Sequence, residues 1–341
     1  MDRYLEAVLL EIASYQRDIP IKADTVFFGG GTPTLFGSHR ICKLLEAIRS
    51  TFDISDDAEI SIEMNPATAD SETLFALKKS GVNRISLGVQ SFVETELQLL
   101  GRAHTANHAI DAIQMISEAG FENFNLDLMY AIPTQTVNTF AYSLEKALSF
   151  SPPHLSIYSL ILEEGTDFWK QKDSLVFPHE KDELKMYQHC AEMLKSKGYE
   201  HYEISNYAKK GRVCRHNLRY WQLSPYIGIG PAAHSYFENR RFYNSNDIAA
   251  YIERPLHQKE LEETVDRQIL AEEYAMLGLR TANGISLSRY QAIAERSFAE
   301  GKDSFLQKCC HEGYLLIDGD KLRLTDKGFY VSNAIIGEFL A

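Results

Sequence analysis

FFGGGTPT, residues 27–34, is the stretch that decides the fold of the first half of the chain. Three glycines, Gly29 to Gly31, directly follow a β-rich run at residues 25–28. Between residues 59 and 158 the arrangement recurs, with apolar strands that end in polar residues and helices between them. This alternation is typical of a parallel sheet with right-handed crossovers. The sequence predicts an α/β fold, and periodicity leaves open a doubly wound sheet or a closed or partial barrel.

The individual elements are predicted from the spacing of apolar residues and from the glycines and prolines that end them. Strands are expected at residues 25–28, 59–63, 84–89, 124–128 and 154–158, with a sixth near 199–204. Helices are expected at residues 3–16, 38–51, 70–80, 93–99, 106–119, 137–149 and 180–197.

The residue composition and the pattern of predicted elements change after about residue 205. Residues 1–204 are expected to form the barrel-like domain, and residues 205–262 a connecting segment rich in Asn, Tyr, Arg, His and Trp. Residues 263–341 read as helices with a two-strand wing, so a small winged-helix-like domain is expected at the C-terminus. The length agrees with about two domains.

Composition narrows the function classes. The chain has 341 residues and a formal net charge of 35 − 47 = −12, which argues against binding nucleic acid through a broad basic surface. No apolar run approaches the roughly 18 residues of a membrane span, so no integral membrane segment is expected. The N-terminal residues read as an amphipathic helix and not as an export signal, so a cytoplasmic location is expected. The odd cysteine number agrees with a reducing compartment: Cys42, Cys190, Cys214, Cys309 and Cys310.

The unusual polar residues follow the predicted strands. Because the carboxyl ends of parallel strands meet at one rim, these groups are expected to converge there. Each residue alone could be structural, as a tight turn, a solvated strand end or a turn cap. Together they suit a zwitterion with a ribose, since carboxylates bind an ammonium or hydroxyls and a guanidinium binds a carboxylate. The candidates are Gly30, Gly31, Thr32, Glu63, Gln90, Arg102, Asp127 and, after the fifth strand, Ile161.

Several motifs resemble one known family. The runs FFGGGTPT (27–34), SIEMNP (61–66), LGVQSF (87–92), LGRAH (100–104) and NLDLMYAIP (125–133) resemble the HemN/HemW radical SAM proteins, which include oxygen-independent coproporphyrinogen III oxidases. The later runs HYEISNYA (201–208), CRHNLRYW (214–221), YIGIGPAAHS (226–235) and LTDKG (324–328) resemble its HemW-type haem chaperones. The likeness extends over nearly the whole chain.

The resemblance implies a partial (βα)₆ TIM-like barrel whose first strand is missing, S-adenosylmethionine (SAM) and a [4Fe–4S] cluster. In this family the glycine-rich loop binds the methionine moiety, which here implicates Gly30, Gly31 and Thr32. The positions that match SAM contacts are Glu63, Gln90, Arg102, Asp127 and, less closely, Ile161.

The cluster motif is where the chain departs from the family. The family binds its cluster through a C-x-x-x-C-x-x-C loop after the first barrel strand, and none of the five cysteines has that spacing. No Fe–S ligand set is therefore expected in this sequence, and whether the chain is an enzyme stays open. Either the sequence is part of a longer protein, which we favour, or it is a natural relative without the cluster.

The run H-N-x-x-Y-W places His216, Asn217, Tyr220 and Trp221 together as a candidate haem-binding segment. A neutral imidazole can ligate haem iron, so His216 is the candidate iron ligand, while the aromatic residues could equally anchor the segment to the protein. His201 and His234 are weaker alternatives, and Arg215 or Arg219 could bind haem propionates.

The expected function is that of a haem-binding chaperone that delivers haem to acceptor proteins, with SAM bound at the barrel rim. The alternative is an anaerobic coproporphyrinogen III dehydrogenase, which uses a SAM-derived radical for the oxidative decarboxylation of porphyrin propionates.

Overall fold

The computed structural model describes residues 1–340, and the chain divides into two compact units. The first contains residues 1–26 and 40–58 and the chain from Cys214 onward. The second, here called the barrel unit, contains residues 27–39 and 59–213.

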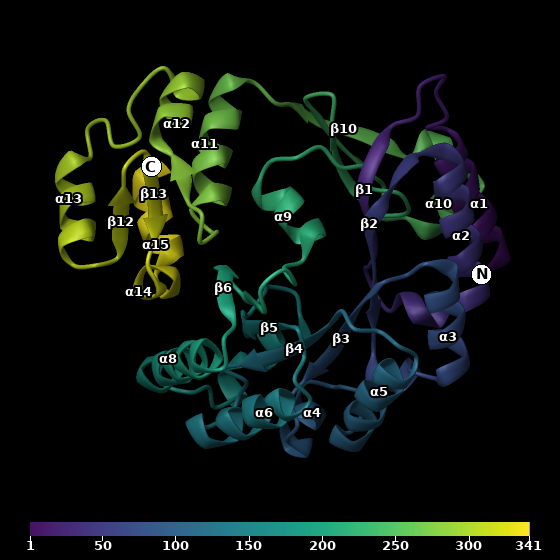
Figure 1. The fold of residues 1–341 in the computed structure, drawn as a ribbon, viewed down its shortest axis with the longest axis horizontal. Coiled ribbons are helices and arrows are strands. Elements are labelled where there is room, and N and C mark those ends of the chain that lie inside the picture. The colour runs from purple at the N-terminus through teal and green to yellow at the C-terminus, as the bar shows by residue number, and fades with distance from the viewer. Residues whose placement is uncertain (341) are drawn as a thin grey trace. The chain divides into compact units, whose positions relative to one another are not determined.

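The main sheet has seven strands in the order β1-β2-β3-β4-β5-β7-β6. Strands β2 to β5 pair in parallel, and the sheet curls into a half-barrel, which confirms the expected partial barrel (Figure 1). Strand β1 lies at one edge of the sheet. The strands are β1 (Lys22–Phe28), β2 (Asp53–Met64), β3 (Arg84–Gln90), β4 (Phe124–Tyr130), β5 (His154–Ser159), β6 (Glu200–Glu203) and β7 (Asn206–Ala208).

The expected sixth strand exists, but it does not pair with the fifth. Strand β7 lies between β5 and β6 and is antiparallel to both. The reason is the short connection at residues 204–205, which allows β6 and β7 to form a hairpin, whereas a parallel neighbour needs a crossover of a dozen or more residues.

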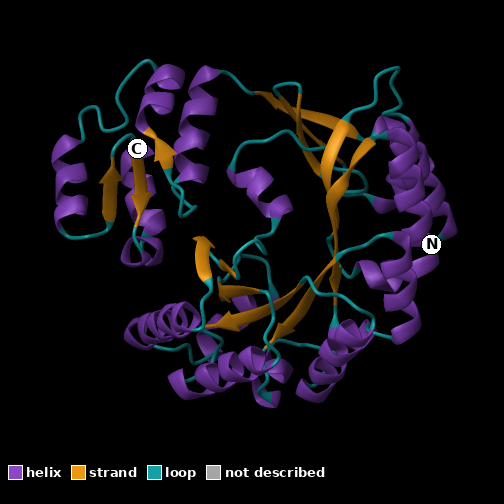
Figure 2. Ribbon diagram, viewed as in Figure 1, coloured by secondary structure: helices purple, strands orange, loops and turns teal. Residues whose placement is uncertain are grey.

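Helices cover the outer face of the half-barrel, as Figure 2 shows. Helix α5 contacts β3, and α6 contacts β4. Polar side chains fix the helix starts: Asp70 caps α3, and Thr105 and Thr136 form capping boxes on α5 and α6. The helices are α3 (Ser71–Ser80), α4 (Glu94–Leu99), α5 (Ala106–Glu118), α6 (Val137–Ser149), α7 (Asp167–Gln171) and α8 (Glu180–Ser196).

The two faces of the curved sheet differ in chemistry because side chains alternate along each strand. On β3 the residues Ile85, Leu87 and Val89 are fully buried. The alternate positions carry Arg84, Ser86 and Gly88 on the opposite face. The paired strands continue this polar face, since Ser86 lies opposite Asn125, Asn125 opposite His154, and Asp127 opposite Ser156.

The other unit combines helices with two small antiparallel sheets, ordered β10-β9-β8 and β11-β13-β12. Its strands are β8 (His234–Phe237), β9 (Arg240–Asn244), β10 (Lys259–Thr264), β11 (Ile285–Ser286), β12 (Leu315–Asp318) and β13 (Lys321–Leu324). Its helices are α1 (Asp2–Ala13), α2 (Ser38–Thr51), α9 (Arg215–Trp221), α10 (Ile248–Glu253), α11 (Arg267–Gly278), α12 (Leu287–Ala294), α13 (Asp303–His311), α14 (Asp326–Tyr330) and α15 (Ser332–Leu340). Within residues 1–340, none of the helices is both long enough and apolar enough to cross a bilayer.

Candidate functional site

The glycine-rich loop after β1 is held open at the rim of the half-barrel. Gly30 has φ +108°, a backbone conformation that side chains rarely adopt, and its N–H donates to Oε2 of Glu63 at 3.1 Å. A Cβ placed on Gly30 or Gly31 would meet no atom within 4 Å. The space beside these glycines is therefore free of the protein's own atoms, as it must be where a ligand approaches the backbone.

Glu63, next to the last residue of β2, is a weaker acid than an ordinary glutamate. Burial and the nearby Asp127 carboxylate raise its pKa to about 7, although the Gly30 N–H opposes the shift. Two carboxylates that share a site repel each other, so one of them retains a proton unless a cation compensates. Near neutral pH, binding of a cation at the rim would therefore deprotonate this carboxyl.

Asp127 and Arg102 complete the charged part of the rim. Asp127, half-buried on β4, accepts a hydrogen bond from Nδ2 of Asn125 at 2.6 Å, and burial raises its pKa while Arg102 opposes this. Arg102 donates through Nη2 to the Gly88 carbonyl at 3.3 Å. Its buried Nε has no hydrogen-bond partner among the described residues. A guanidinium with an unused buried donor suits a ligand that carries an acceptor.

Gly88 lets Gln90 and Arg102 come together. A Cβ on Gly88 would lie 3.0 Å from Nε2 of Gln90 and 3.2 Å from Nη2 of Arg102. Gln90 itself has φ +66°, a rare conformation for a residue with a side chain. Gly88 is not among the residues predicted from the sequence, although the alternation of positions 84, 86, 88 and 90 on one face of β3 is a signal that could have revealed it.

The structure therefore connects most of the predicted SAM-contact residues: Gly30, Glu63, Gln90, Arg102 and Asp127. Gly31 is exposed in the same loop, and Thr32 is half-buried where the loop enters a 3₁₀ turn at Pro33–Phe36. Ile161 is 74% exposed in the segment after β5, and no described contact connects it to the charged residues of the rim.

The H-N-x-x-Y-W run lies on helix α9 and at its end, in the other unit. Nδ1 of His216 lies 2.9 Å from the Thr25 hydroxyl, and Nε2 lies 2.9 Å from the Tyr220 hydroxyl. Tyr220 packs edge-on against Tyr226, with ring centroids 4.7 Å apart, and burial raises its pKa to about 12. Asn217 and Trp221 are half-buried. The imidazole is thus oriented from both sides.

The two arginines of this helix are engaged with carboxylates. Arg215 contacts Asp57 at 3.2 Å and Asp24 at 3.3 Å, and Arg219 pairs with Asp24. A haem propionate that binds either guanidinium would therefore have to displace Asp24 or Asp57, and propionate binding by these arginines stays a prediction. The alternative ligands are stacked on tyrosines, His201 on Tyr207 at 4.2 Å and His234 on Tyr243 at 5.2 Å.

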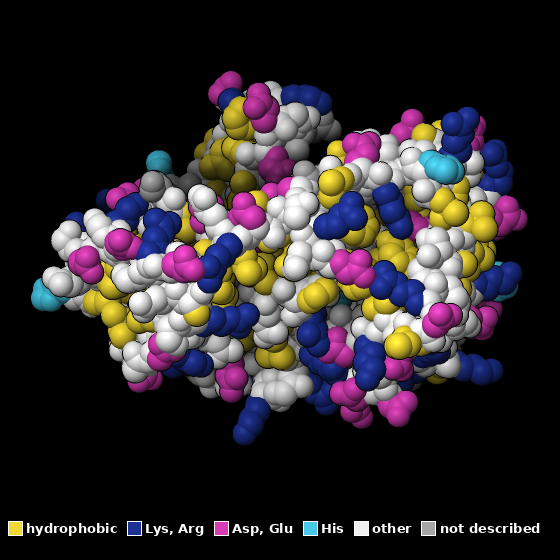
Figure 3. Space-filling view, turned by 90° about the horizontal axis from the view of Figure 1, so that it is seen from above, with side chains coloured by type: hydrophobic (Ala, Val, Ile, Leu, Met, Phe, Trp, Pro, Cys, Tyr) yellow, Lys and Arg dark blue, Asp and Glu magenta, His cyan; other side chains and the backbone are white. Residues whose placement is uncertain are grey.

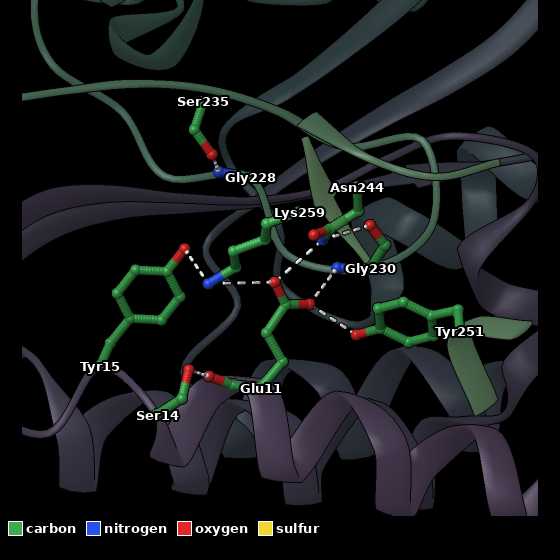
Figure 4. A network of polar contacts seen from close by, with 9 residues as sticks. All are labelled: Glu11, Ser14, Tyr15, Gly228, Gly230, Ser235, Asn244, Tyr251 and Lys259. Carbon is green, nitrogen blue, oxygen red and sulfur yellow. Dashed lines mark hydrogen bonds and ion pairs between the residues drawn. The ribbon is translucent and has the colours of Figure 1, made fainter. Parts of the chain in front are cut away.

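A buried glutamate in the first helix organises the YIGIGPAAHS run. Glu11 is fully buried and accepts hydrogen bonds from the Gly230 N–H at 2.9 Å, Asn244 Nδ2 at 2.9 Å and the Tyr251 hydroxyl at 2.5 Å (Figure 4). Lys259 lies 3.7 Å from the same carboxylate. A buried charge with this many donors fixes the loop around Gly230 to helix α1. Periodicity missed it because its partners are more than two hundred residues away.

Comparison with known proteins identifies the family of this chain. Residues 2–147 match the Radical SAM superfamily, and residues 265–331 match the HemN C-terminal domain. The chain is 33% identical to heme chaperone HemW of Lactococcus lactis subsp. lactis (strain IL1403), over 100% of this chain and 90% of that protein. It is 35% identical to heme chaperone HemW of Bacillus subtilis (strain 168), over 100% of this chain and 92% of that protein.

The chain belongs to the HemN/HemW family of radical SAM proteins. The resemblance inferred from the motifs is thus confirmed. The structure is similar to that of coproporphyrinogen III oxidase (HemN) from Escherichia coli, with a TM-score of 0.83, 23% identity, and coverage of 99% of this chain and 82% of that chain. At this identity the likeness shows the fold alone.

The rim of this HemN/HemW family member fits SAM. The unused Arg102 Nε, the open space beside Gly31 and the two adjacent carboxylates suit a ligand with carboxylate, ammonium, sulfonium and ribose groups. When bound, SAM supplies a sulfonium cation that can be cleaved reductively. The residues that would hold it are Gly30, Gly31, Glu63, Gln90, Arg102 and Asp127.

The [4Fe–4S] cluster of the family does not fit the residues of this chain. None of the five cysteines, all within residues 1–340, forms a disulfide, and they are far apart in sequence except for the adjacent pair Cys309 and Cys310 on α13. Burial raises the pKa of both thiols of this pair and of Cys190, which disfavours the thiolate form that binds iron. Among residues 1–340 no three His, Cys, Asp or Glu side chains are grouped as a metal site.

Proposed function

We propose that this protein binds haem and delivers it to acceptor proteins, with SAM bound at the rim of the half-barrel. The support for haem transfer is that relatives named heme chaperone HemW match at 33% and 35% identity over the whole of this chain. A cytoplasmic location belongs to the proposal and agrees with the absence of disulfides among the five cysteines, which lie within residues 1–340, since disulfides are rare in a reducing compartment.

The observation that carries haem binding is the arrangement around His216. If iron bound Nε2, Nδ1 would carry the ring hydrogen and could donate a hydrogen bond to the Thr25 hydroxyl, which lies 2.9 Å away. Such a partner on the far nitrogen fixes the tautomer and the orientation of a metal-ligating imidazole. The Tyr220 hydroxyl is hydrogen-bonded to Nε2, the nitrogen that we propose binds iron. Tyr220 is 40% exposed, so its side chain has room to move away when haem binds.

The surface chemistry gives no support to nucleic acid as a partner. The net charge is −12, and Figure 3 shows Lys and Arg side chains interspersed with Asp and Glu over the face in view. Strong binding to nucleic acid depends on neutralising several phosphates at once with clustered basic groups. The proposal therefore takes haem and a haem-accepting protein as the partners.

A haem titration followed by the Soret band tests the proposal. The wild-type chain is expected to give a saturable shifted Soret band, and His216→Ala is expected to lose it or to weaken haem binding at least tenfold. His311→Ala is the control, since His311 is an exposed histidine on α13 of the same unit and is not a candidate haem ligand. A Soret titration that is equal for wild type and His216→Ala, with both proteins folded, removes His216 as the ligand.

A further inference from the structure

Beneath the candidate SAM site, a chain of buried polar side chains crosses the inner face of the half-barrel. It runs from Tyr202 on β6 through His154 on β5 and Asn125 on β4 to Asp127 at the rim. The Tyr202 hydroxyl lies 2.7 Å from Nε2 of His154, and Nδ1 of His154 lies 2.6 Å from Oδ1 of Asn125. His154 is fully buried and Asn125 is 1% exposed.

The amide of Asn125 determines the direction in which the hydrogen bonds between these side chains are donated. Its Nδ2 donates both hydrogens, to Asp127 Oδ1 at 2.6 Å and to Ser86 Oγ at 2.8 Å. Its Oδ1 accepts from Ser156 Oγ at 3.1 Å and faces the imidazole of His154. An amide oxygen can only accept, so Nδ1 of His154 must carry a hydrogen. All four hydrogen-bonding positions of the amide are then satisfied.

The remaining proton positions follow from the charge of the imidazole. Burial and the nearby Arg84 hold the pKa of His154 well below its usual range, so the ring is neutral and carries one hydrogen. With that hydrogen on Nδ1, Nε2 must accept from the Tyr202 hydroxyl. The hydrogen bonds from Tyr202 through His154 and Asn125 are therefore all donated in the direction of Asp127, whose Oδ1 accepts the last N–H.

We propose that His154 is a positioning residue, acting through Asn125, that fixes the Asp127 carboxylate in the SAM site with its Oδ1 as the acceptor of an amide N–H. The inference rests on the proposed binding of SAM at the rim. Reversal of the imidazole would place an acceptor against the Asn125 oxygen, and the amide could relieve this only by turning its own oxygen toward Asp127. Asp127 would then need a proton, and a protonated carboxyl attracts a cationic or hydroxyl-bearing ligand less strongly.

Nitrogen-15 NMR of histidine-labelled, ligand-free protein tests the direction of the chain without any ligand. His154→Gln identifies the His154 signals by their loss. The expected spectrum shows Nδ1 protonated and Nε2 unprotonated for His154 across neutral pH. An Nε2–H tautomer in the folded wild-type protein overturns the proposal, whether or not any variant folds.

Calorimetric titration with SAM tests the consequence for binding. In His154→Gln the side-chain amide can still donate to Asn125 and accept from Tyr202, so SAM affinity should stay within about threefold of wild type. His154→Leu removes both bonds and should weaken SAM binding at least tenfold. Equal SAM affinities of wild type and folded His154→Leu overturn the inference. A wild-type protein that binds no SAM refutes the proposed SAM site instead, and the NMR result then decides the direction of the hydrogen bonds.

Discussion

SAM binding should become stronger as pH rises through neutrality, because Glu63 must lose its proton to face a cation. The pKa of Glu63 in the ligand-free protein is about 7. A group with this pKa is about 9% ionised at pH 6 and about 76% ionised at pH 7.5. If the ionised form binds SAM, the association constant rises about eightfold over this interval. Isothermal titration in two buffers of different ionisation enthalpy should also detect proton release on binding.

Two variants make this test specific. Glu63→Gln removes the titrating group and should bind SAM weakly with a nearly flat pH dependence, so any titration of the ligand's own amino group is seen in isolation. Glu72→Gln alters an exposed carboxylate on α3 of the same unit and should retain the wild-type profile. An identical pH profile in wild type and Glu63→Gln refutes the reasoning.

The same pKa shift has a consequence for the stability of the ligand-free protein. The folded protein keeps a proton on Glu63 that the unfolded chain releases above its ordinary pKa of 4.5. Unfolding therefore releases a proton between about pH 4.5 and 7, and the contribution of Glu63 to the free energy of unfolding falls as pH rises through this window. Because the carboxyl is partly exposed, the slope should be well below the full value of about 1.4 kcal/mol per pH unit.

Three further substitutions test other parts of the structure. Gly88→Ala places a Cβ against the Gln90 and Arg102 side chains and should weaken SAM binding at least tenfold in calorimetry, with little change in the melting temperature. Glu11→Leu leaves Lys259 and several donors without their acceptor and should cost about 3–5 kcal/mol in urea unfolding, and a loss below about 1 kcal/mol contradicts a central role for Glu11. Tyr220→Phe frees Nε2 of His216 and should strengthen haem binding about fivefold to tenfold in a Soret titration, as expected for one hydrogen bond, while weaker binding would show that Tyr220 assists haem.

The order of strands and helices could be predicted because each element carries its own apolar period. Residues 84–89 and 124–128 read as strands from their apolar side chains alone, and their ends locate the rim because parallel strands share one carboxyl edge. The pairing of β7 between β5 and β6 could not be predicted in this way. It depends on a three-residue strand, Asn206–Ala208, which is too short to show a period.

The contacts that support each site could not be predicted from local sequence patterns. Thr25 and His216 are separated by 191 residues, and Glu11 and Gly230 by 219. A sequence shows that a polar residue is unusual in an apolar run, but it does not show which distant group satisfies it. The alternation Asn125–Asp127 and His154–Ser156 does contain a signal for the polar face of the sheet. Over so few residues, however, a strand with one polar face and a strand whose polar residues mark a site at its end have the same sequence pattern.

The charges of the rim explain why a cationic ligand suits it. Glu63 and Asp127 contribute two carboxylates, and Arg102 contributes one guanidinium that is near enough to affect Asp127. The fully ionised rim therefore has a net charge of −1, and the raised pKa of Glu63 shows the cost of that imbalance without a ligand. SAM carries an ammonium, a sulfonium and a carboxylate, and in the proposed complex its net charge of +1 would restore neutrality in the site. The protein can thus keep the rim nearly neutral in both states, by a proton on Glu63 when it is free and by the ligand's cation when it is bound.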